Sequence, residues 1–193
     1  MNPPRDLADG NRTALLTPPG RGAVAVVAAE GPAALATIDA HFAAANGRPL
    51  ARQAVDRILF GHWRHGDARE EIVVCRTASE CVEVQCHGGV AAAERIVATL
   101  AAAGCRVESW RQWVGGAGES PVAREARIAL AAAPTRRTAA ILLDQWHGAL
   151  ERDVAAIEQS LTAGDAPDEA AGRLAALRGR AALGGRLAEP WQV

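Results

Sequence analysis

The hydrophobic pattern of the chain changes near residue 115, from short strand-like runs to long helical stripes. In the first part, apolar residues form short runs or alternate with polar ones, which is typical of strands. Two segments instead repeat apolar residues every three or four positions and stop at glycine, as helices do. The pattern predicts strands at 13–16, 23–29, 57–63, 71–75, 80–86 and 106–110, of which 57–63 and 71–75 form a hairpin. It predicts helices at 32–45, with Phe42 on its inner face, and at 89–103.

Beyond the Gly115–Gly118 break the pattern predicts only helices. The first covers 123–133 and stops at Pro134, and the third opens at Asp165 and Pro167. The second is one long helix with a single apolar stripe, because its apolar residues recur in steps of three and four from Ala139 to Leu161. The fold class predicted is therefore α+β: a mixed-sheet domain over 13–115, followed by an α-helical segment over 120–187.

Composition excludes several classes of function. The 21 basic and 22 acidic side chains give a net charge of −1, which argues against a direct nucleic-acid clamp. Every basic residue is arginine, so a Schiff-base lysine and a P-loop lysine are both excluded. The 4 cysteines are too few and unevenly spaced for a disulfide framework. Without an apolar signal core or a run of membrane-spanning length, the sequence predicts a cytoplasmic protein with no membrane partner.

Candidate chemistry gathers on the strand at 80–86 and the residues after it. Alternation places Cys81, Glu83, Gln85 and His87 on one face, with the valines on the other facing the core. Side chains at alternate positions of one strand are about 7 Å apart, too far to share a metal ion without further ligands. We therefore expect a polar strand face that lines a cleft, with no metal site.

Two glycine-containing bends flank these strands. Thr17-Pro18-Pro19-Gly20-Arg21-Gly22 precedes one strand and places Arg21, able to grip an anion, between two glycines. His87-Gly88-Gly89 leads from a strand into a helix, whose first amides could receive a carboxylate or phosphate. Each bend also fits a purely structural turn that needs glycine. Four of the five tryptophans, Trp110, Trp113, Trp146 and Trp191, are expected to be apolar anchors.

Together, the two bends and their spacing resemble the N-terminal domain of the MnmE (TrmE) family, GTPases that modify the wobble uridine of tRNA. The resemblance implies a GcvT-like domain, related to the folate-binding domains of one-carbon enzymes, that forms a homodimer and binds a tetrahydrofolate derivative at the dimer interface. It further implies a helical domain into which a Ras-like GTPase domain is inserted, and a partner flavoprotein in tRNA modification.

Residue by residue, the resemblance predicts a ligand site formed by Glu83, His87, Gly88, Gly89 and Arg21. That site is eroded, because the family's arginine on the strand after the first bend falls at Ala28. The family's serine-tyrosine-threonine-glycine loop is shortened to Arg76–Ser79, and Trp110–Ser120 replaces the segment that carries its lysine. A dianionic folate loses both cationic partners. We therefore expect no certain cofactor, with a tetrahydrofolate derivative as the candidate to test.

The predicted function is that of the dimerisation and folate-site-like part of an MnmE/TrmE family protein. No P-loop motif occurs in the sequence, so the chain as it stands is not a GTPase, and residues 188–193 are expected to begin a truncated GTPase domain. No catalytic residue is assigned. Two alternatives stay open: a small folate-dependent one-carbon transfer enzyme using Glu83 as polar anchor and His87 as acid/base, and the N-terminal part of a GTPase of another pathway.

Overall fold

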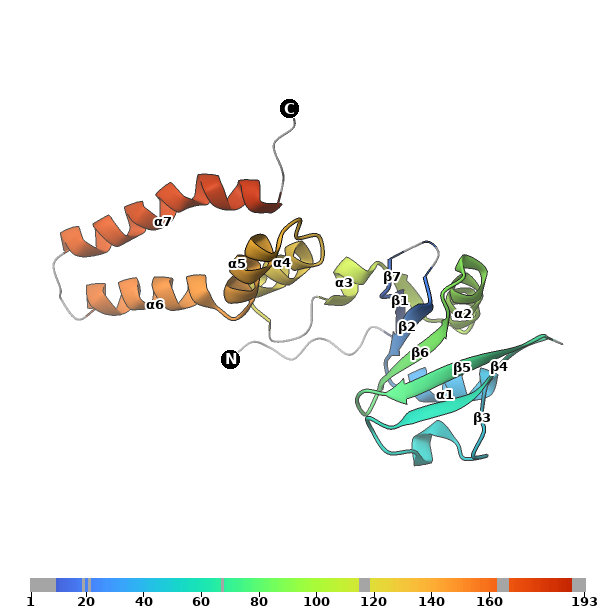
Figure 1. Ribbon diagram of the computed structural model, residues 1–193. Helices are drawn as coiled ribbons and strands as arrows, with labels where there is room; N and C mark the ends of the chain where they lie inside the picture. Colours follow the sequence, from blue (N-terminus) through green and yellow to red (C-terminus); the bar gives the residue numbers. More distant parts are fainter. Residues whose placement is uncertain are drawn as a thin grey trace. The chain divides into compact units, whose positions relative to one another are not determined.

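The structure is a computed structural model that describes residues 10–18, 20, 22–66, 68–114, 119–162 and 167–188. The chain divides into two compact units, Met1–Trp113 and Val114–Val193. The first contains a sheet with helices, and the second contains helices (Figure 1). The predicted α+β class with a mixed sheet is confirmed.

The first unit is built on a 7-stranded sheet with the order β3-β4-β5-β6-β2-β1-β7. Only the β1–β7 pair is parallel among the pairs described, and the remainder are antiparallel. The strands are β1 (Arg12–Leu15), β2 (Val24–Glu30), β3 (Phe42–Ala44), β4 (Ile58–His65), β5 (Ala68–Arg76), β6 (Cys81–His87) and β7 (Arg106–Glu108). The β4–β5 hairpin and the strand β6 confirm the sequence prediction.

One face of this sheet carries the core. The helices α1 (Ala34–His41) and α2 (Val90–Ala102) pack on it together with the 3-10 turn η1 (Leu50–Arg52). Ile38, Leu50 and Leu100 have no exposed surface there, and the inward residues of β4, β5 and β6 join the same cluster. In β6 the burial alternates along the strand, as the period of two predicts, and Val82, Val84 and Cys86 face inward.

The prediction that Phe42 lies on a helix is wrong. The helix α1 ends at His41, and Phe42 is extended (φ −100°, ψ 125°) and opens the edge strand β3. Phe42 pairs with Trp63 of β4 and stays 5% exposed, so its burial was anticipated although its conformation was not. Its ring lies over Gly61, the only residue type that leaves room for it, because a Cβ at Gly61 would overlap both the ring and the carbonyl oxygen of Ala43.

In the second unit, the predicted long helix is two helices. These are α5 (Arg136–Trp146) and α6 (Ala149–Thr162), separated at Gly148, whose φ of 83° favours glycine. The unit also has α4 (Pro121–Leu130) and α7 (Pro167–Ala188). Ser120 and Thr135 cap α4 and α5 by accepting hydrogen bonds from the backbone N–H groups of Ala123 and Thr138. The break divides the predicted stripe, and Leu143, Val154 and Leu161 remain 39–51% exposed.

Only part of the tryptophan prediction holds. Trp110, Trp113 and Trp146 are half-buried, and Trp191 lies outside the described residues. Trp110 does not end a strand but begins α3 (Trp110–Val114), since β7 stops at Glu108. The fully buried anchor is Trp63, at 1% exposure, stacked on His41 with ring centroids 5.4 Å apart.

None of the helices that the structure describes combines the length and apolar character needed to cross a membrane.

Candidate functional site

The two bends meet in space. The N–H of Gly22 donates a hydrogen bond to the carbonyl oxygen of Gly88 at 3.0 Å, and the N–H of Gly88 donates to the carbonyl oxygen of Ala23 at 3.2 Å. The antiparallel ladder of β2 and β6 leads directly into this clasp, because Val24 pairs with His87. The described residues of the two bends therefore adjoin one another at the end of the β2–β6 ladder of the mixed sheet. Pro19 and Arg21 of the first bend lie outside the described residues.

Gly88 is required by this approach of two backbones. A Cβ at Gly88 would overlap the carbonyl group of Gly22 and lie 2.9 Å from its Cα. Gly89 is in a different position, since nothing lies within 4 Å of a Cβ placed there. It is the N-cap of α2, in an extended conformation, with no side-chain cap. The two glycines therefore have separate roles: Gly88 closes the clasp, and Gly89 begins the helix.

The polar face of β6 is oriented away from the core. Glu83 and Gln85 are half-buried on this face and His87 is exposed. Their partners on β2 are Ala28, Val26 and Val24, in that order. Ala28 therefore stands directly opposite Glu83, so no side chain on the neighbouring strand brings a positive charge to this carboxylate. Glu83 and His87 are four residues apart along one strand, about 13 Å, and cannot act on one bond together.

A cavity of about 220 Å³ opens on this outer face. Gln85 and His87 line it, together with Phe60 of β4 and Glu71 and Val73 of β5, whereas Glu83 is not among its lining residues. The site predicted as one group is thus split: His87 and Gln85 border the cavity, Glu83 lies beside it, and Gly88 and Gly89 belong to the clasp. Sequence reasoning missed Phe60 and Glu71, which the strand register brings next to Gln85 through Val73.

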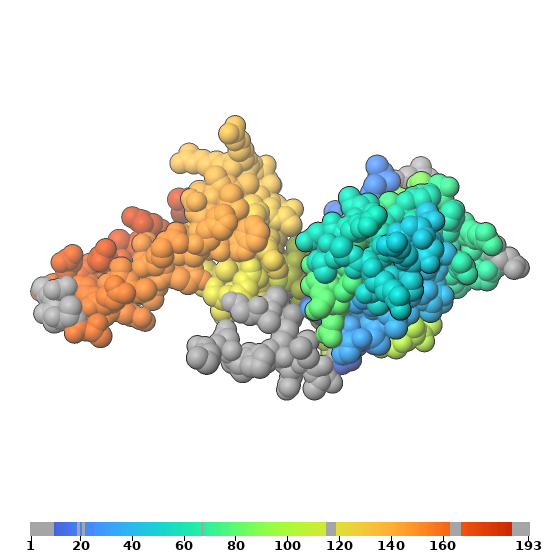
Figure 2. All heavy atoms as spheres, turned by 90° about the horizontal axis from the view of Figure 1, so that it is seen from below, coloured from blue at the N-terminus to red at the C-terminus, as the bar shows by residue number. Residues whose placement is uncertain are grey.

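The outer face is also apolar and exposed. The exposed fraction is 74% for Ile58, 50% for Phe60 and 53% for Val24. The strand register also places one row of residues across β4, β5, β6 and β2, consisting of Phe60, Val73, Gln85 and Val26. The cyan atoms of β4 and the segment before it lie at the surface of the first unit in Figure 2. Exposed apolar side chains in one contiguous patch are typical of an interaction surface.

An ionic network joins β2, β1 and β7 at one edge of the sheet, on the same outer face. Arg12 of β1 donates hydrogen bonds to Glu30 of β2 (Nε to Oε2, 2.9 Å) and to Glu108 of β7 (3.0 Å), and its guanidinium lies 4.3 Å from the centre of the Trp113 ring. Burial opposes ionisation of Glu108, but hydrogen bonds from Arg106 and Arg12 outweigh it and hold the pKa of Glu108 below its ordinary value. The network is structural, because its charged groups already contact one another.

The cysteines are poorly suited to nucleophilic chemistry. Burial raises the pKa of the Cys86 thiol to about 11 and also raises the pKa values of Cys75, Cys81 and Cys105. A nucleophilic cysteine needs a lowered pKa, so these thiols are protonated at neutral pH. Within the described parts of the chain, no group of histidine, cysteine, aspartate and glutamate is placed to hold a metal ion.

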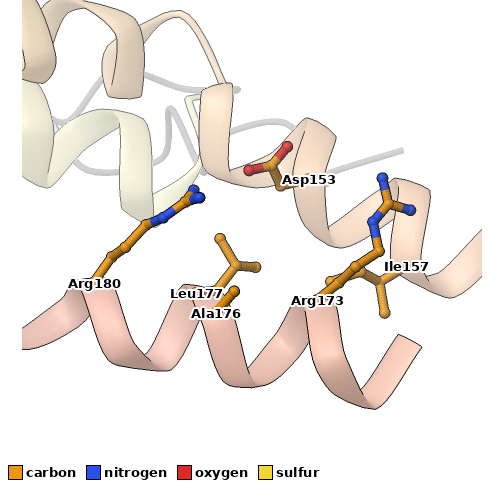
Figure 3. Close-up of a pocket in the computed structure, with 6 residues that line it drawn as sticks. All are labelled: Asp153, Ile157, Arg173, Ala176, Leu177 and Arg180. Carbon is orange, nitrogen blue, oxygen red and sulfur yellow. The ribbon is translucent and has the colours of Figure 1, made fainter. Parts of the chain in front are cut away.

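A smaller hollow of about 130 Å³ lies between α6 and α7 in the second unit. Figure 3 shows Arg173 and Arg180 extending from α7 toward α6, with Asp153 between them and the apolar Ile157 and Leu177 below. Two guanidinium groups and one carboxylate leave one net positive charge at this hollow. All of its lining residues belong to α6 and α7, so the hollow is a feature of the packing of these two helices.

The sequence is similar to a known family over the same residues that form the sheet. The family model described as "GTP-binding protein TrmE N-terminus" matches residues 12–109, half of the 193-residue chain. The match begins with β1 and ends just after β7.

Three relatives are named tRNA modification GTPase MnmE. The protein of Lacticaseibacillus paracasei is 33% identical over 104 residues, which cover 49% of this chain and 22% of that protein. Those of Lysinibacillus sphaericus and Moorella thermoacetica are 28% and 26% identical over 77% and 81% of this chain. The chain spans about a third of the length of the latter two relatives (35% and 37%). With the N-terminal family model covering half of it and the two bends clasped within that region, the chain belongs to the MnmE/TrmE family and contains its N-terminal domain.

Proposed function

We propose that this chain is the dimerisation module of a tRNA modification GTPase, and that its partner in dimerisation is a second copy of itself. The observation that carries the proposal is the outer face of the sheet. The helices α1 and α2 cover one face, while the opposite face presents Ile58 and Phe60 to solvent at 74% and 50% exposure. An antiparallel sheet tolerates one solvated face when that face is polar, but apolar rows favour burial against a partner.

A second copy fits this face because a twofold axis brings the same patch onto itself, and an apolar patch is self-complementary. The half-buried Val73 and Val26 extend the patch between the exposed side chains. The charged side chains Glu71 and Glu83 lie within the patch. Burying a charge costs free energy, so these two residues limit the area that a partner can cover without trapping water.

Sedimentation equilibrium of the full chain tests this arrangement. The wild type should sediment as a dimer at micromolar concentration. Ile58→Asp should weaken the dimer about a hundredfold, equivalent to about 2.8 kcal/mol, because it places a carboxylate in an apolar contact. Leu183→Asp is the matched control: Leu183 is 68% exposed on α7, outside the sheet, and its replacement should leave the dimer constant unchanged. Equal effects of both substitutions would contradict the assignment of this face.

We further propose that the first unit is GcvT-like in origin and that its folate site is worn away. The support is local: Ala28 stands opposite Glu83 where the family resemblance implies an arginine, so this position of β2 supplies no positive charge to a dianionic ligand. Calorimetric titration of the protein with 5-formyltetrahydrofolate should show no saturable binding below millimolar ligand concentration. Ala28→Arg is the informative variant, since restoring the cation should restore binding. Tight binding by the wild type would overturn this part of the proposal.

The proposed setting is the cytoplasm, with the rest of the tRNA modification machinery, including a partner flavoprotein. The support is the membership of the family alone. Co-purification with the flavoprotein from the same organism tests this setting. If the flavoprotein binds only the dimer, the Ile58→Asp variant should no longer co-purify with it; if it binds the monomer, co-purification should persist.

A further inference from the structure

We propose that Arg64 and Arg69, at the tip of the β4–β5 hairpin, bind an oxyanion: the phosphate or carboxylate group of a small molecule. The strand register pairs Arg64 directly with Arg69. Directly opposite residues of an antiparallel pair project from the same face, and both of these side chains are exposed. The proposal goes beyond dimerisation and folate, because it requires neither a second copy nor the cation that Ala28 replaces.

The pair is unusual because like charges directly opposite one another destabilise a hairpin. Within the residues that the structure describes, neither guanidinium takes part in an ion pair. Glu71 follows Arg69 on the same face, but it stands opposite His62 and forms no ion pair with either arginine. The chain carries a net charge of −1, and residues 64–71 contain three acidic residues beside these two arginines, so the positive charge is confined to the Arg64–Arg69 pair and does not belong to a generally basic surface.

The chemistry of the pair suits an oxyanion. Guanidinium groups are planar and present paired N–H donors that match the oxygens of phosphate and carboxylate. Opposed residues have Cβ atoms about 4.5–5.5 Å apart, so both side chains can reach the same group. A divalent oxyanion neutralises both arginines at once and removes their repulsion. Binding should therefore be visible as a gain in stability of the folded protein.

Thermal unfolding of the full chain tests the proposal, with inorganic phosphate and glutarate as probes and chloride at matched ionic strength as reference. Phosphate at about ten times its dissociation constant should raise the Tm of the wild type by about 4 °C or more. Arg69→Gln should lose this shift, yet should melt in chloride no lower than the wild type, because the repulsion is gone. Arg178→Gln is the matched control, because Arg178 is an exposed arginine of α7; this variant should keep the Tm shift with phosphate.

The two probes distinguish the source of the oxyanion. A Tm shift with phosphate alone identifies the ligand group as a phosphate, and a Tm shift with glutarate alone identifies it as a carboxylate. A Tm shift with both probes supports a site that accepts either oxyanion. The proposal is overturned when neither probe raises the Tm of the wild type above the chloride value, or when Arg69→Gln keeps the full shift.

Discussion

The clasp between the two bends can be tested by adding a single methyl group. In Gly88→Ala the new Cβ overlaps the carbonyl group of Gly22, so one of the two backbones must move. Overpacking of this kind costs about 1–3 kcal/mol. The movement also strains the hydrogen bonds from Gly22 to Gly88 and from Gly88 to Ala23, each worth about 1 kcal/mol net. We expect a total loss of about 2–5 kcal/mol in the free energy of unfolding.

Urea unfolding measures this loss, and Gly89→Ala is the matched control in the adjacent position. A Cβ at Gly89 meets nothing within 4 Å, and the residue has an extended conformation that alanine adopts. Its replacement should cost about 1 kcal/mol or less, because alanine is a poorer N-cap residue than glycine. If Gly88→Ala were no more destabilising than Gly89→Ala, the clasp would not hold the two bends and the reasoning would be wrong.

Three further substitutions test other parts of the structure. Glu108→Gln should make the free energy of unfolding less dependent on pH on the acid side. The pKa of Glu108 is below its ordinary value of 4.5 in the folded state, so its contribution to the free energy of unfolding is present above pH 4.5 and is lost as the pH falls below it. Urea unfolding between pH 3 and pH 7 checks this. Trp146→Phe should cost about 1–2 kcal/mol in the second unit, because the indole N–H donates to Glu119 at 2.8 Å; calorimetry should show an unchanged first unit. Gly61→Ala should cost about 2–4 kcal/mol by displacing the edge strand β3, and hydrogen exchange of Phe42–Ala44 should increase with it.

The sequence predicted best what depends on local periodicity. Alternation in Cys81–His87 placed the valines inward, and the structure agrees because a strand has a strict period of two. The hairpin of β4 and β5 followed from two apolar runs joined by a polar turn. The stripe from Ala139 to Leu161 was followed too far, although Gly148 within it is the residue type that ends a helix. Periodicity alone gave no reason to weigh that glycine above the stripe.

What the sequence could not supply depends on partners far along the chain. Phe42 leaves its helix because β4 offers it a strand to pair with, and Gly61 makes room for its ring. The contact of Arg12 with Glu108 joins residues 96 positions apart, and nothing near either one signals it. The cavity beside Gln85 needs Phe60, which only the order of the strands brings there.

The central claim is that the outer sheet face pairs with a second copy of the chain. Hydroxyl-radical footprinting of Ile58 and Phe60 across a dilution series tests it most directly, with the exposed Leu183 of α7 as internal reference. The account predicts that oxidation of Ile58 and Phe60 falls as the protein concentration rises, while oxidation of Leu183 stays constant. Oxidation of Ile58 and Phe60 that is as strong in concentrated as in dilute solution would contradict it.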